Sequence, residues 1–382
     1  MPTYTSRETY DFISRQTNDP IVEWKTCKVS GQPFPIYQSD VEFYEKISPM
    51  FNGKKYQIPT PTLCSEERER RRLAFRNERE LYNRKCDFSG KPIISAYSPD
   101  KPLKIYNQQV WRSDQWDAIT YGRDYNFNLS FTENFKALLY EVPLPALTNL
   151  NAENAEYCNR CNYNKNCYLT FMTSYSQDSM YGTFIQRSND CIDCTVAFEC
   201  DNCYDCCHIS NCTGLFHSHN CYDCSLSSYI DFCRGCSNCY ACHNLHNQQY
   251  CILNVPYTRE EYFERIKTIS PEQIQAFKQQ IQKEKTVVKS EHCFGRDITT
   301  SKNCKLSYNG FEAEDCKYCL NYGDLKDSYD CSAFGHKCSL CLENIAGEED
   351  YHTAFTFAVI GGKNTRYSMF CVQNISHLFG CV

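Results

Sequence analysis

Two runs of cysteines at three-residue spacing are the residues of this chain best suited to chemistry. They are Cys200, Cys203 and Cys206, followed by Cys233, Cys236, Cys239 and Cys242. Thiolates at such short spacing bind zinc or iron–sulfur clusters. The second run resembles the cysteine motif of a bacterial ferredoxin, but its fourth interval differs and no proline follows. These seven cysteines are therefore the candidate metal ligands, and zinc is the metal that fits them best.

A longer repeat gives the same cysteines a second interpretation. From residue 165 onward, an Asn or Asp precedes a small or apolar residue, and another small or apolar residue follows three places later. The first column advances by steps of twelve and then of nine through Cys167, Ser179, Cys191, Cys203, Cys212, Cys221, Ile230 and Cys239. A column that exchanges cysteine with isoleucine is a packing position. Most of the thiols are therefore expected to be buried and reduced, with metal binding as the alternative.

The residue before each position of this column is Asn or Asp in seven of eight units. Both side chains tolerate the left-handed backbone conformation, so they suit a corner that recurs once per unit. A unit this short cannot hold two packed helices, but it fits short strands joined by corners. We therefore predict a β-solenoid, similar to a β-helix, at residues 151–255.

The same unit returns less regularly at residues 291–382, which predicts a second solenoid lobe. Its first column is Cys304, Cys316, Ser328, Cys338, Tyr351, Tyr367 and Leu378. The end of this lobe lacks the capping helices that are expected after the first one. We therefore expect that the chain is a fragment, or that a partner or self-association covers this C-terminal coil.

Residues 256–290 are expected to form a helical cap or linker between the two lobes. Thr258 with Glu261, and Ser270 with Gln273, are capping boxes, and Pro271 suits a first helical position. Helices are predicted at residues 259–268 and 271–285.

Residues 1–150 are expected to form an α+β domain with degenerate zinc-ribbon motifs. Cys27 and Cys86 each begin a turn that resembles a zinc knuckle, but Ser30 and Ser89 occupy the positions of the second thiolates. Only Cys64 lies between the two turns. We therefore expect a zinc-ribbon fold without its metal.

An arginine-rich helix is predicted at residues 65–85, with basic side chains from Arg68 to Lys85. This helix is the one segment of the chain that favours nucleic acid as a partner. Glutamates alternate with the arginines, which is typical of a solvated, self-paired helix face. The solvated face is the preferred interpretation.

Charge and hydropathy restrict the compartment and the partners. Residues 151–255 carry 4 basic and 10 acidic side chains, which argues against a surface that follows phosphates. The sequence contains neither a signal peptide nor an apolar run long enough to span a membrane. A cytoplasmic protein with reduced thiols is expected.

Several short stretches resemble a family of uncharacterised cysteine-rich zinc-ribbon/solenoid proteins of candidate-phyla, small-genome bacteria. They include Arg76-Asn77, Tyr97-Ser98-Pro99-Asp100, Trp111-Arg112-Ser113-Asp114 and Tyr250-Cys251-Ile252-Leu253-Asn254. The family has no established activity, so the resemblance implies architecture and bacterial origin without a function. It also places further metal ligands at Asn107 and Val110, which cannot serve as such here.

No catalytic constellation can be assigned, so an enzyme is not the expected function. A glycan-directed hydrolase or lyase is a remote alternative, for which acids are available at Asp190, Asp193, Asp201, Asp205 and Asp223. The preferred hypothesis is a noncatalytic binding or scaffold protein that presents acidic, Tyr- and Asn-rich solenoid surfaces to a macromolecular partner. The alternative is a cysteine-rich protein that binds zinc for storage, sensing or structure.

Overall fold

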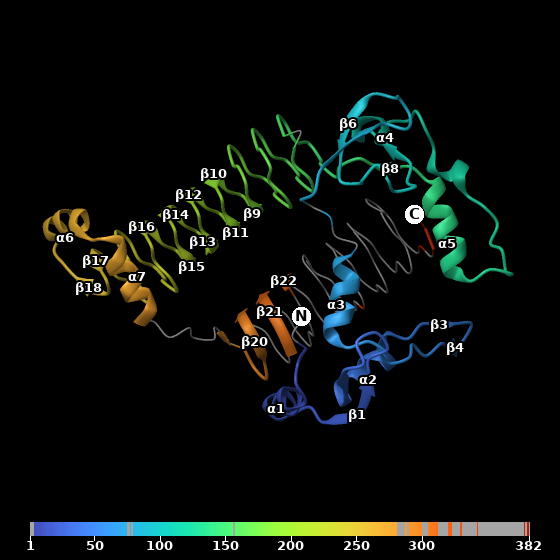
Figure 1. The fold of residues 1–382 in the computed structure, drawn as a ribbon, viewed down its shortest axis with the longest axis horizontal. Helices are drawn as coiled ribbons and strands as arrows, with labels where there is room; N and C mark the ends of the chain where they lie inside the picture. The colour runs from blue at the N-terminus through green and yellow to red at the C-terminus, as the bar shows by residue number, and fades with distance from the viewer. Residues whose placement is uncertain are drawn as a thin grey trace. The chain divides into compact units, whose positions relative to one another are not determined.

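The structure is a computed structural model that describes residues 4–74, 77, 79–155 and 157–280, and after these residues 287–288, 290–299, 305–311, 320–322, 329–330, 342, 378 and 380–381. The chain is mainly β, with a β-solenoid of about four turns at residues 183–228 and several helices (Figure 1). It divides into two compact units, one of Met1–Arg76, Asn126–Lys136 and Glu284–Val382, the other of Asn77–Tyr125 and Ala137–Lys283.

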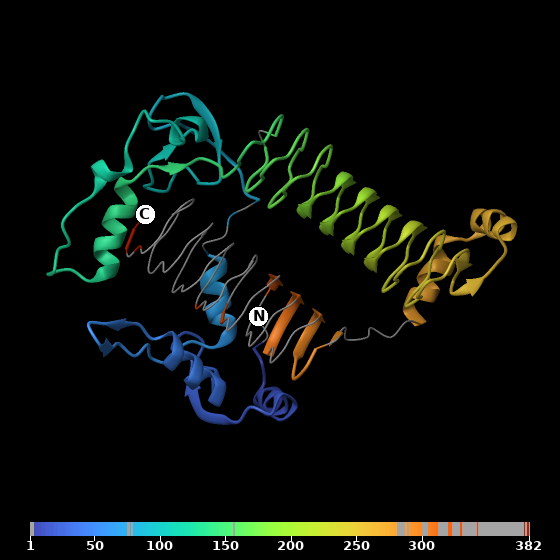
Figure 2. The same cartoon turned by 180° about the vertical axis from the view of Figure 1, so that it is seen from behind.

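The solenoid contains two parallel sheets, and each coil contributes one strand to each sheet. One sheet consists of β9 (Thr183–Gln186), β11 (Thr195–Phe198), β13 (Cys207–Ser210) and β15 (His219–Tyr222). The other consists of β10 (Asn189–Ile192), β12 (Asp201–Tyr204), β14 (Thr213–Phe216) and β16 (Ser225–Ser228). The coils are stacked in chain order, as the view from behind also shows (Figure 2).

The register between coils is uniform. Cys191 pairs with Cys203 in β10 and β12, and Ala197 pairs with Ile209 in β11 and β13, so each coil advances the chain by twelve positions. Isolated parallel bridges continue this spacing on both sides of the sheets, up to the bridge between Tyr240 and Ile252. The predicted solenoid is therefore confirmed for the first cysteine-rich segment.

The steps of nine in the sequence column are not coil lengths. Every third residue points inward, so four inward positions share each coil of twelve. A step of nine from Cys203 to Cys212 leads to a different side of the next coil, whereas Cys203 stacks on Cys191. The sequence pattern could not separate these cases because all four inward positions accept the same small or apolar side chains.

The residues before the inward positions of the sequence column adopt the left-handed backbone conformation. All eight corner residues of the sequence column have positive φ, for example 50° at Asp190 and 53° at Asn202. The predicted corner role of Asn and Asp is therefore confirmed. The same conformation is imposed on residues that disfavour it, including the β-branched Val196, whose φ is 60°.

Replacing Val196 should consequently stabilise the solenoid. Val196→Asn places a side chain that tolerates positive φ at this corner, and the unfolding temperature of the chain should rise because roughly 1 kcal/mol of backbone strain is relieved. Thr195→Asn is the matched control, since Thr195 is exposed and lies in strand β11. Differential scanning calorimetry measures both variants. An equal effect of the two substitutions would contradict the strain argument.

The first unit begins with helices and short hairpins. Its elements are α1 (Arg7–Thr17), β1 (Ile21–Thr26), β2 (Pro33–Tyr37), α2 (Gln38–Ile47), β3 (Met50–Phe51), β4 (Lys54–Lys55) and α3 (Ser65–Leu73). Helix α1 starts at Ser6, whose Oγ accepts the N–H of Thr9, and it buries Tyr10 and Ile13 against the β1–β2 hairpin. Cys27 and Cys64 belong to the same small core.

The second unit contains a further hairpin and a few short elements before the solenoid. They are β5 (Tyr82–Lys85), β6 (Pro92–Ser95), β7 (Ile105–Tyr106), α4 (Gln108–Trp111), η1 (Ala118–Tyr121) and β8 (Leu144–Pro145), while α5 (Phe131–Glu141) is shared with the first unit. Trp116 packs edge-on against Tyr106, and the Trp111 indole donates to the carbonyl of Pro143 at 2.9 Å.

The helix predicted at residues 65–85 is too long. Helix α3 ends at Leu73, and Tyr82–Lys85 forms strand β5, which pairs with β6. The Asn77 side chain accepts the N–H of Glu80 at 3.0 Å and donates to the carbonyl of Ala96. Such side-chain bonds to the local backbone compete with a helix.

Two arginines of α3 are buried, contrary to the predicted solvated face. Arg68 is 4% exposed and Arg72 is 2% exposed, and both pair with the fully buried Asp330. Arg70 remains exposed beside Glu67, with 3.1 Å between Nη1 and Oε1. Arg68 and Arg72 are therefore not accessible to a nucleic acid, which weakens the hypothesis that this helix binds one.

The helices predicted after the solenoid are confirmed at both capping boxes. A short hairpin of β17 (Cys251–Ile252) and β18 (Val255–Pro256) leads into α6 (Arg259–Arg265), η2 (Ile266–Thr268) and α7 (Pro271–Gln280). Thr258 Oγ1 accepts the N–H of Glu261, and Ser270 Oγ accepts the N–H of Gln273. The predicted extension of the second helix to residue 285 lies outside the described residues.

Later in the chain the structure contains a parallel sheet of β19 (Val287–Val288), β20 (Phe294–Thr299), β21 (Lys305–Phe311) and β22 (Leu320–Tyr322). Within it, Tyr308 pairs with Leu320 and Gly310 with Tyr322. Most of the second column, from Cys304 to Tyr367, lies outside the described residues. Among the helices that are described, none is long and apolar enough to cross a lipid bilayer.

Candidate functional site

The predicted metal ligands lie in the interior of the solenoid. Each is at most 2% exposed, and all belong to one core cluster: Cys200, Cys203, Cys206, Cys233, Cys236, Cys239 and Cys242. Ile185, Ile209 and Leu215 occupy equivalent inward positions in the same cluster. The predicted burial of these cysteines is confirmed.

The inward side chains bond to the backbone in a pattern that recurs from coil to coil. The thiol of Cys212 donates to the carbonyl of Ser210, two residues earlier, at 3.2 Å, and to that of Cys221, nine residues later, at 3.4 Å. Hydroxyls at inward positions also accept the N–H of the residue twelve places later, as Ser188 Oγ does from Cys200 at 3.0 Å.

Cysteine sulfurs receive the same inward N–H groups. The N–H of Cys212 points at the sulfur of Cys200, one coil earlier. An inward side chain must tolerate burial, as Ile209 and Leu215 do, and a serine or cysteine at such a position can also offer an acceptor. Burial and hydrogen bonding are thus two reasons for cysteine at inward positions that involve neither a metal nor a reaction.

Burial opposes the charged form of these thiols, but contacts between them raise the pKa of some and lower that of others. Burial, followed by contact with Cys158, raises the pKa of Cys161 well above 9.0. Contacts with the thiols of Cys194 and Cys203, together with burial, likewise raise the pKa of Cys191. Contacts with neighbouring thiols lower the pKa of Cys203, so the interior thiols divide into those that keep their proton and those that accept hydrogen bonds.

Neighbouring thiols contact each other within a coil and between coils. Cys236, for example, lies against Cys224, Cys233 and Cys239. Stacked side chains form rows along the axis instead of surrounding one point. Within the part of the chain that the structure describes, no group of three or more His, Cys, Asp or Glu side chains is arranged to hold a metal ion.

Thiol titration separates buried thiols from metal ligands. Among the described cysteines, Cys207, Cys293 and Cys381 are partly exposed. Cys207 should react with a thiol reagent in the native protein, whereas its buried neighbour Cys206 should react only after denaturation. Cys207→Ser should remove one fast-reacting thiol, and Cys206→Ser should leave the fast count unchanged. About one bound zinc per four unreactive thiols, released by a chelator with loss of fold, would contradict this expectation.

The two Cys-x-x-Ser-Gly turns of the N-terminal part have the same backbone geometry. Gly31 N–H donates to the carbonyl of Cys27 at 2.9 Å, and Gly90 N–H donates to that of Cys86 at 2.8 Å. Both glycines have positive φ, 71° and 69°. Each turn joins the strands of one hairpin, β1–β2 or β5–β6.

The first turn directs several donors at the sulfur of Cys27. Burial alone would raise the pKa of Cys27, but the hydroxyl of Ser30 and backbone N–H groups, including that of Ser30, outweigh it and lower the pKa to about 7. Cys64, at the start of α3, is the adjacent thiol, 3.7 Å from Ser30 Oγ. Burial raises the pKa of Cys64 to about 11.

The second turn repeats this arrangement around Cys86. Burial raises its pKa, but the Ser89 hydroxyl and backbone N–H groups, including that of Asn107, lower it overall. Asn107 N–H donates to Cys86 Sγ at 3.2 Å. Asn107, where the family resemblance implies a metal ligand, therefore lies next to the sulfur of Cys86. It contributes its backbone N–H and not a metal-binding side chain.

Removing the Ser30 hydroxyl tests this polarisation. In Ser30→Ala the pKa of Cys27 should rise because a donor to the thiolate is lost. Because Cys27 is buried, the carbon-13 chemical shift of its Cβ over a pH series measures this pKa without a reagent, and the Cys27→Ser spectrum assigns the signal. Ser89→Ala is the control, since it should affect Cys86 and leave Cys27 unchanged. An unchanged pH profile in Ser30→Ala would contradict the assignment.

The outward positions of the solenoid form ladders of side chains. Asn166 Nδ2 donates to Asp178 Oδ1 at 2.9 Å, and Asn189 Nδ2 donates to Asp201 Oδ1 at 2.9 Å. The acids considered for a glycan enzyme belong to such outward positions, and Asp190, Asp193 and Asp205 are corner residues with positive φ. They are distributed over successive coils.

One edge of the solenoid carries an aromatic ridge. We define it as Tyr157, Tyr168, Met180, Tyr181, Ile192, Tyr204, Phe216, His217 and Tyr229. Tyr181 is 54% exposed and Phe216 is 39% exposed. The rings touch in two groups along the ridge, with centroids 5.8 Å apart between Tyr168 and Tyr181 in one group and 4.8 Å apart between His217 and Tyr229 in the other.

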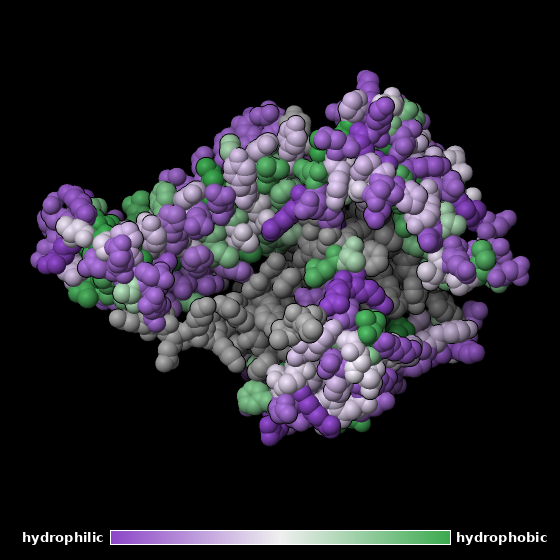
Figure 3. Space-filling view, in the orientation of Figure 1, coloured by the Kyte–Doolittle hydropathy of each residue, from purple (hydrophilic) through white to green (hydrophobic). Residues whose placement is uncertain are grey.

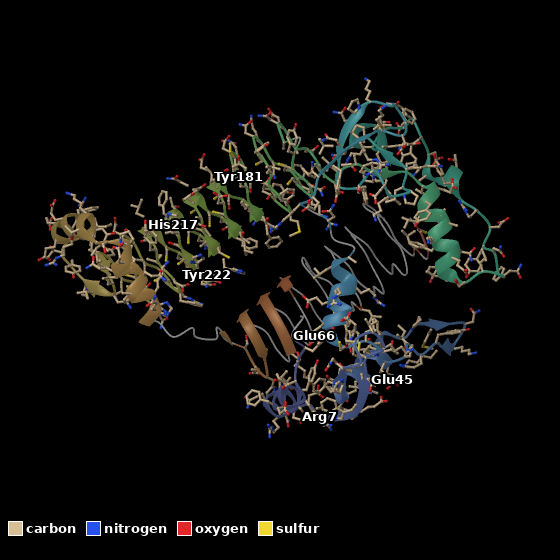
Figure 4. The ribbon with its side chains drawn as sticks, viewed as in Figure 1. Arg7, Glu45, Glu66, Tyr181, His217 and Tyr222 are labelled. Atoms are coloured by element: carbon tan, nitrogen blue, oxygen red, sulfur yellow. The ribbon has the colours of Figure 1, made fainter. Side chains whose placement is uncertain are left out.

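Figure 4 shows Tyr181 and His217 along the same edge of the solenoid, with Tyr222 at the opposite edge. In the space-filling view, apolar residues alternate with polar ones over the coils (Figure 3). Carboxylates accompany the ridge, and His217 Nδ1 lies 2.8 Å from Asp205 Oδ2. The edge therefore combines exposed rings with negative charge.

Cations of the chain itself already contact solenoid rings. Lys278 of α7 places Nζ 5.5 Å from the ring centre of Tyr229, and the Arg234 guanidinium lies 5.0 Å from that of Tyr222. Such contacts are favourable at exposed sites.

Neither the protein-family models nor the curated proteins match this chain. The site is therefore interpreted from its own residues. The inward cysteines and the Asn and Asp corners could be recognised from the repeat, whereas the aromatic ridge was not predicted. The signal that could have identified it is a period of twelve positions, since Tyr157, Tyr181, His217 and Tyr229 are multiples of twelve apart.

Proposed function

We propose that this protein is a noncatalytic recognition scaffold whose solenoid presents acidic, Tyr- and Asn-rich surfaces to a macromolecular partner. The single observation that carries the proposal is the repetition of outward side chains once per coil, exemplified by the exposed rings of Tyr157 and Tyr181. Extended repeat surfaces of this type commonly serve recognition.

The chemistry of the inward and outward positions supports this function. Inward thiols such as Cys203 and Cys236 are only 1% exposed, so their sulfurs are poorly accessible to a substrate. Outward rings such as Tyr168, Tyr181 and Tyr204 remain 40% or more exposed, although burying aromatic area is favourable. Exposed apolar area in a contiguous strip is typical of an interaction site.

Peptide display tests the proposal without a known partner. The full chain is immobilised, and a random peptide library is selected against it in parallel with the heat-denatured chain. Enriched sequences specific to the folded chain are expected, and their binding should weaken as salt is raised from about 0.05 M to about 0.3 M, because the surface is acidic. A library that yields no sequence specific to the folded chain would overturn the proposal.

Zinc binding for storage, sensing or structure is the second candidate. The contact of Cys236 with three other thiols is the observation in its favour. The thiol and metal measurement described above distinguishes it from the scaffold, because a chelator would release metal-bound thiols and would leave metal-free buried thiols unreactive.

Two finer features of the fold belong to the same proposal. We infer that the parallel sheet of β19 to β22 continues as a second solenoid lobe, since Tyr308 and Leu320 pair at the same spacing of twelve as the coils of the first. We also infer that the turns at Cys27 and Cys86 are degenerate zinc knuckles. Their donors are directed at sulfur in both turns, as they would be around a metal-bound thiolate.

A further inference from the structure

The aromatic ridge has a specific chemistry beyond general recognition. It combines rings with carboxylates on the same edge, and along the corner positions of successive coils two acids lie between rings: Tyr181, Asp193, Asp205, His217 and Tyr229. Asp193 is exposed beside the ridge, and Asp205 contacts His217. Rings bind cations through their faces and carboxylates bind them through charge.

The chain itself provides an example of such an interaction. Helix α7 reaches the end of the ridge, where Lys278 lies over Tyr229 at 5.5 Å. Tyr229 is only partly exposed, whereas the ridge residues of the preceding coils, such as Phe216 and Tyr204, are exposed. One end of the ridge thus already accepts a lysine from a helix, and the remaining coils continue that surface.

The dimensions of the ridge also match a helix. Neighbouring strands of a sheet are about 4.8 Å apart, so the five coils from Tyr168 to Phe216 span about 19 Å. A helix of about 13 residues has this length, and its turns of about 5.4 Å nearly follow the coils. Lysines or arginines spaced by three and four residues would all face the ridge.

We propose that the ridge from Tyr168 to Phe216 binds a basic amphipathic helix of a partner protein, which extends the contact that Lys278 of α7 makes with Tyr229. The proposal rests on the recognition function above and specifies the chemistry of its partner. The four basic and ten acidic side chains of residues 151–255 provide complementary charge. Rings of the ridge stack against the cationic side chains, while Asp193 pairs with them.

The test uses a synthetic helical peptide with lysines on one face, long enough to cover the whole ridge, and a second peptide in which glutamates replace these lysines. Fluorescence anisotropy with the full chain should detect binding of the lysine peptide and none of the glutamate peptide. Tyr181→Asn should weaken that binding by fivefold or more, because one ring of the ridge is lost. Asn tolerates the positive φ of 54° at this corner, so the fold should be retained.

Tyr175→Asn is the matched control. Tyr175 has the same φ of 54° and is 58% exposed, but it stacks on Tyr163 outside the ridge. Its substitution should change the affinity less than twofold, and circular dichroism should confirm that both variants are folded. Equal losses in the two variants, or equal binding of both peptides, would overturn the proposal.

The outcomes also separate this inference from the proposed function. If the lysine peptide fails to bind while display selects other sequences specific to the folded chain, the basic helix is wrong and the recognition scaffold stands. If display selects nothing and the lysine peptide does not bind, both are wrong. Binding of the lysine peptide that Tyr181→Asn weakens supports both.

Discussion

The solenoid depends on one interaction, the hydrogen bond from the N–H of an inward residue to the side chain one coil earlier. Cys200 N–H reaches Ser188 Oγ in this way, and Cys212 N–H reaches the sulfur of Cys200. Inward positions also hold Ile209 and Leu215, which fill the interior without offering an acceptor. Cysteine combines both roles, because it tolerates burial and its sulfur can accept a hydrogen bond, so the backbone favours cysteine without excluding apolar residues.

The sequence predicted the parts of the fold that local chemistry controls. Asn and Asp marked the left-handed corners, and the capping boxes at Thr258 and Ser270 marked two helix starts. It did not predict the coil length, because inward positions three places apart are chemically alike. It also failed for α3, since Asp330, which neutralises Arg68 and Arg72, lies far away in the chain and the pattern of charges alone indicated solvent.

In the candidate site, too, features set by local chemistry were predicted, whereas contacts between residues far apart in the chain were not. Burial of the seven cysteines could be read from their exchange with apolar residues, whereas the pairing of Cys64 with the turn at Cys27 required the tertiary structure. The two turns show that polarisation of a sulfur by backbone N–H groups is a property of the turn itself. It persists at Cys86, where Asn107 supplies a donor.

The constant length of the coil restricts how such a protein can change in size. Inserting or deleting one whole coil leaves every later side chain on its own edge. Inserting a quarter of a coil would keep side chains inward or outward but transfer each later one to a neighbouring edge, which would interrupt the alignment of Tyr181 with His217 and Tyr229. Evolution by whole coils would therefore lengthen the binding edge without altering its chemistry, and the extent of the contact could change independently of its specificity.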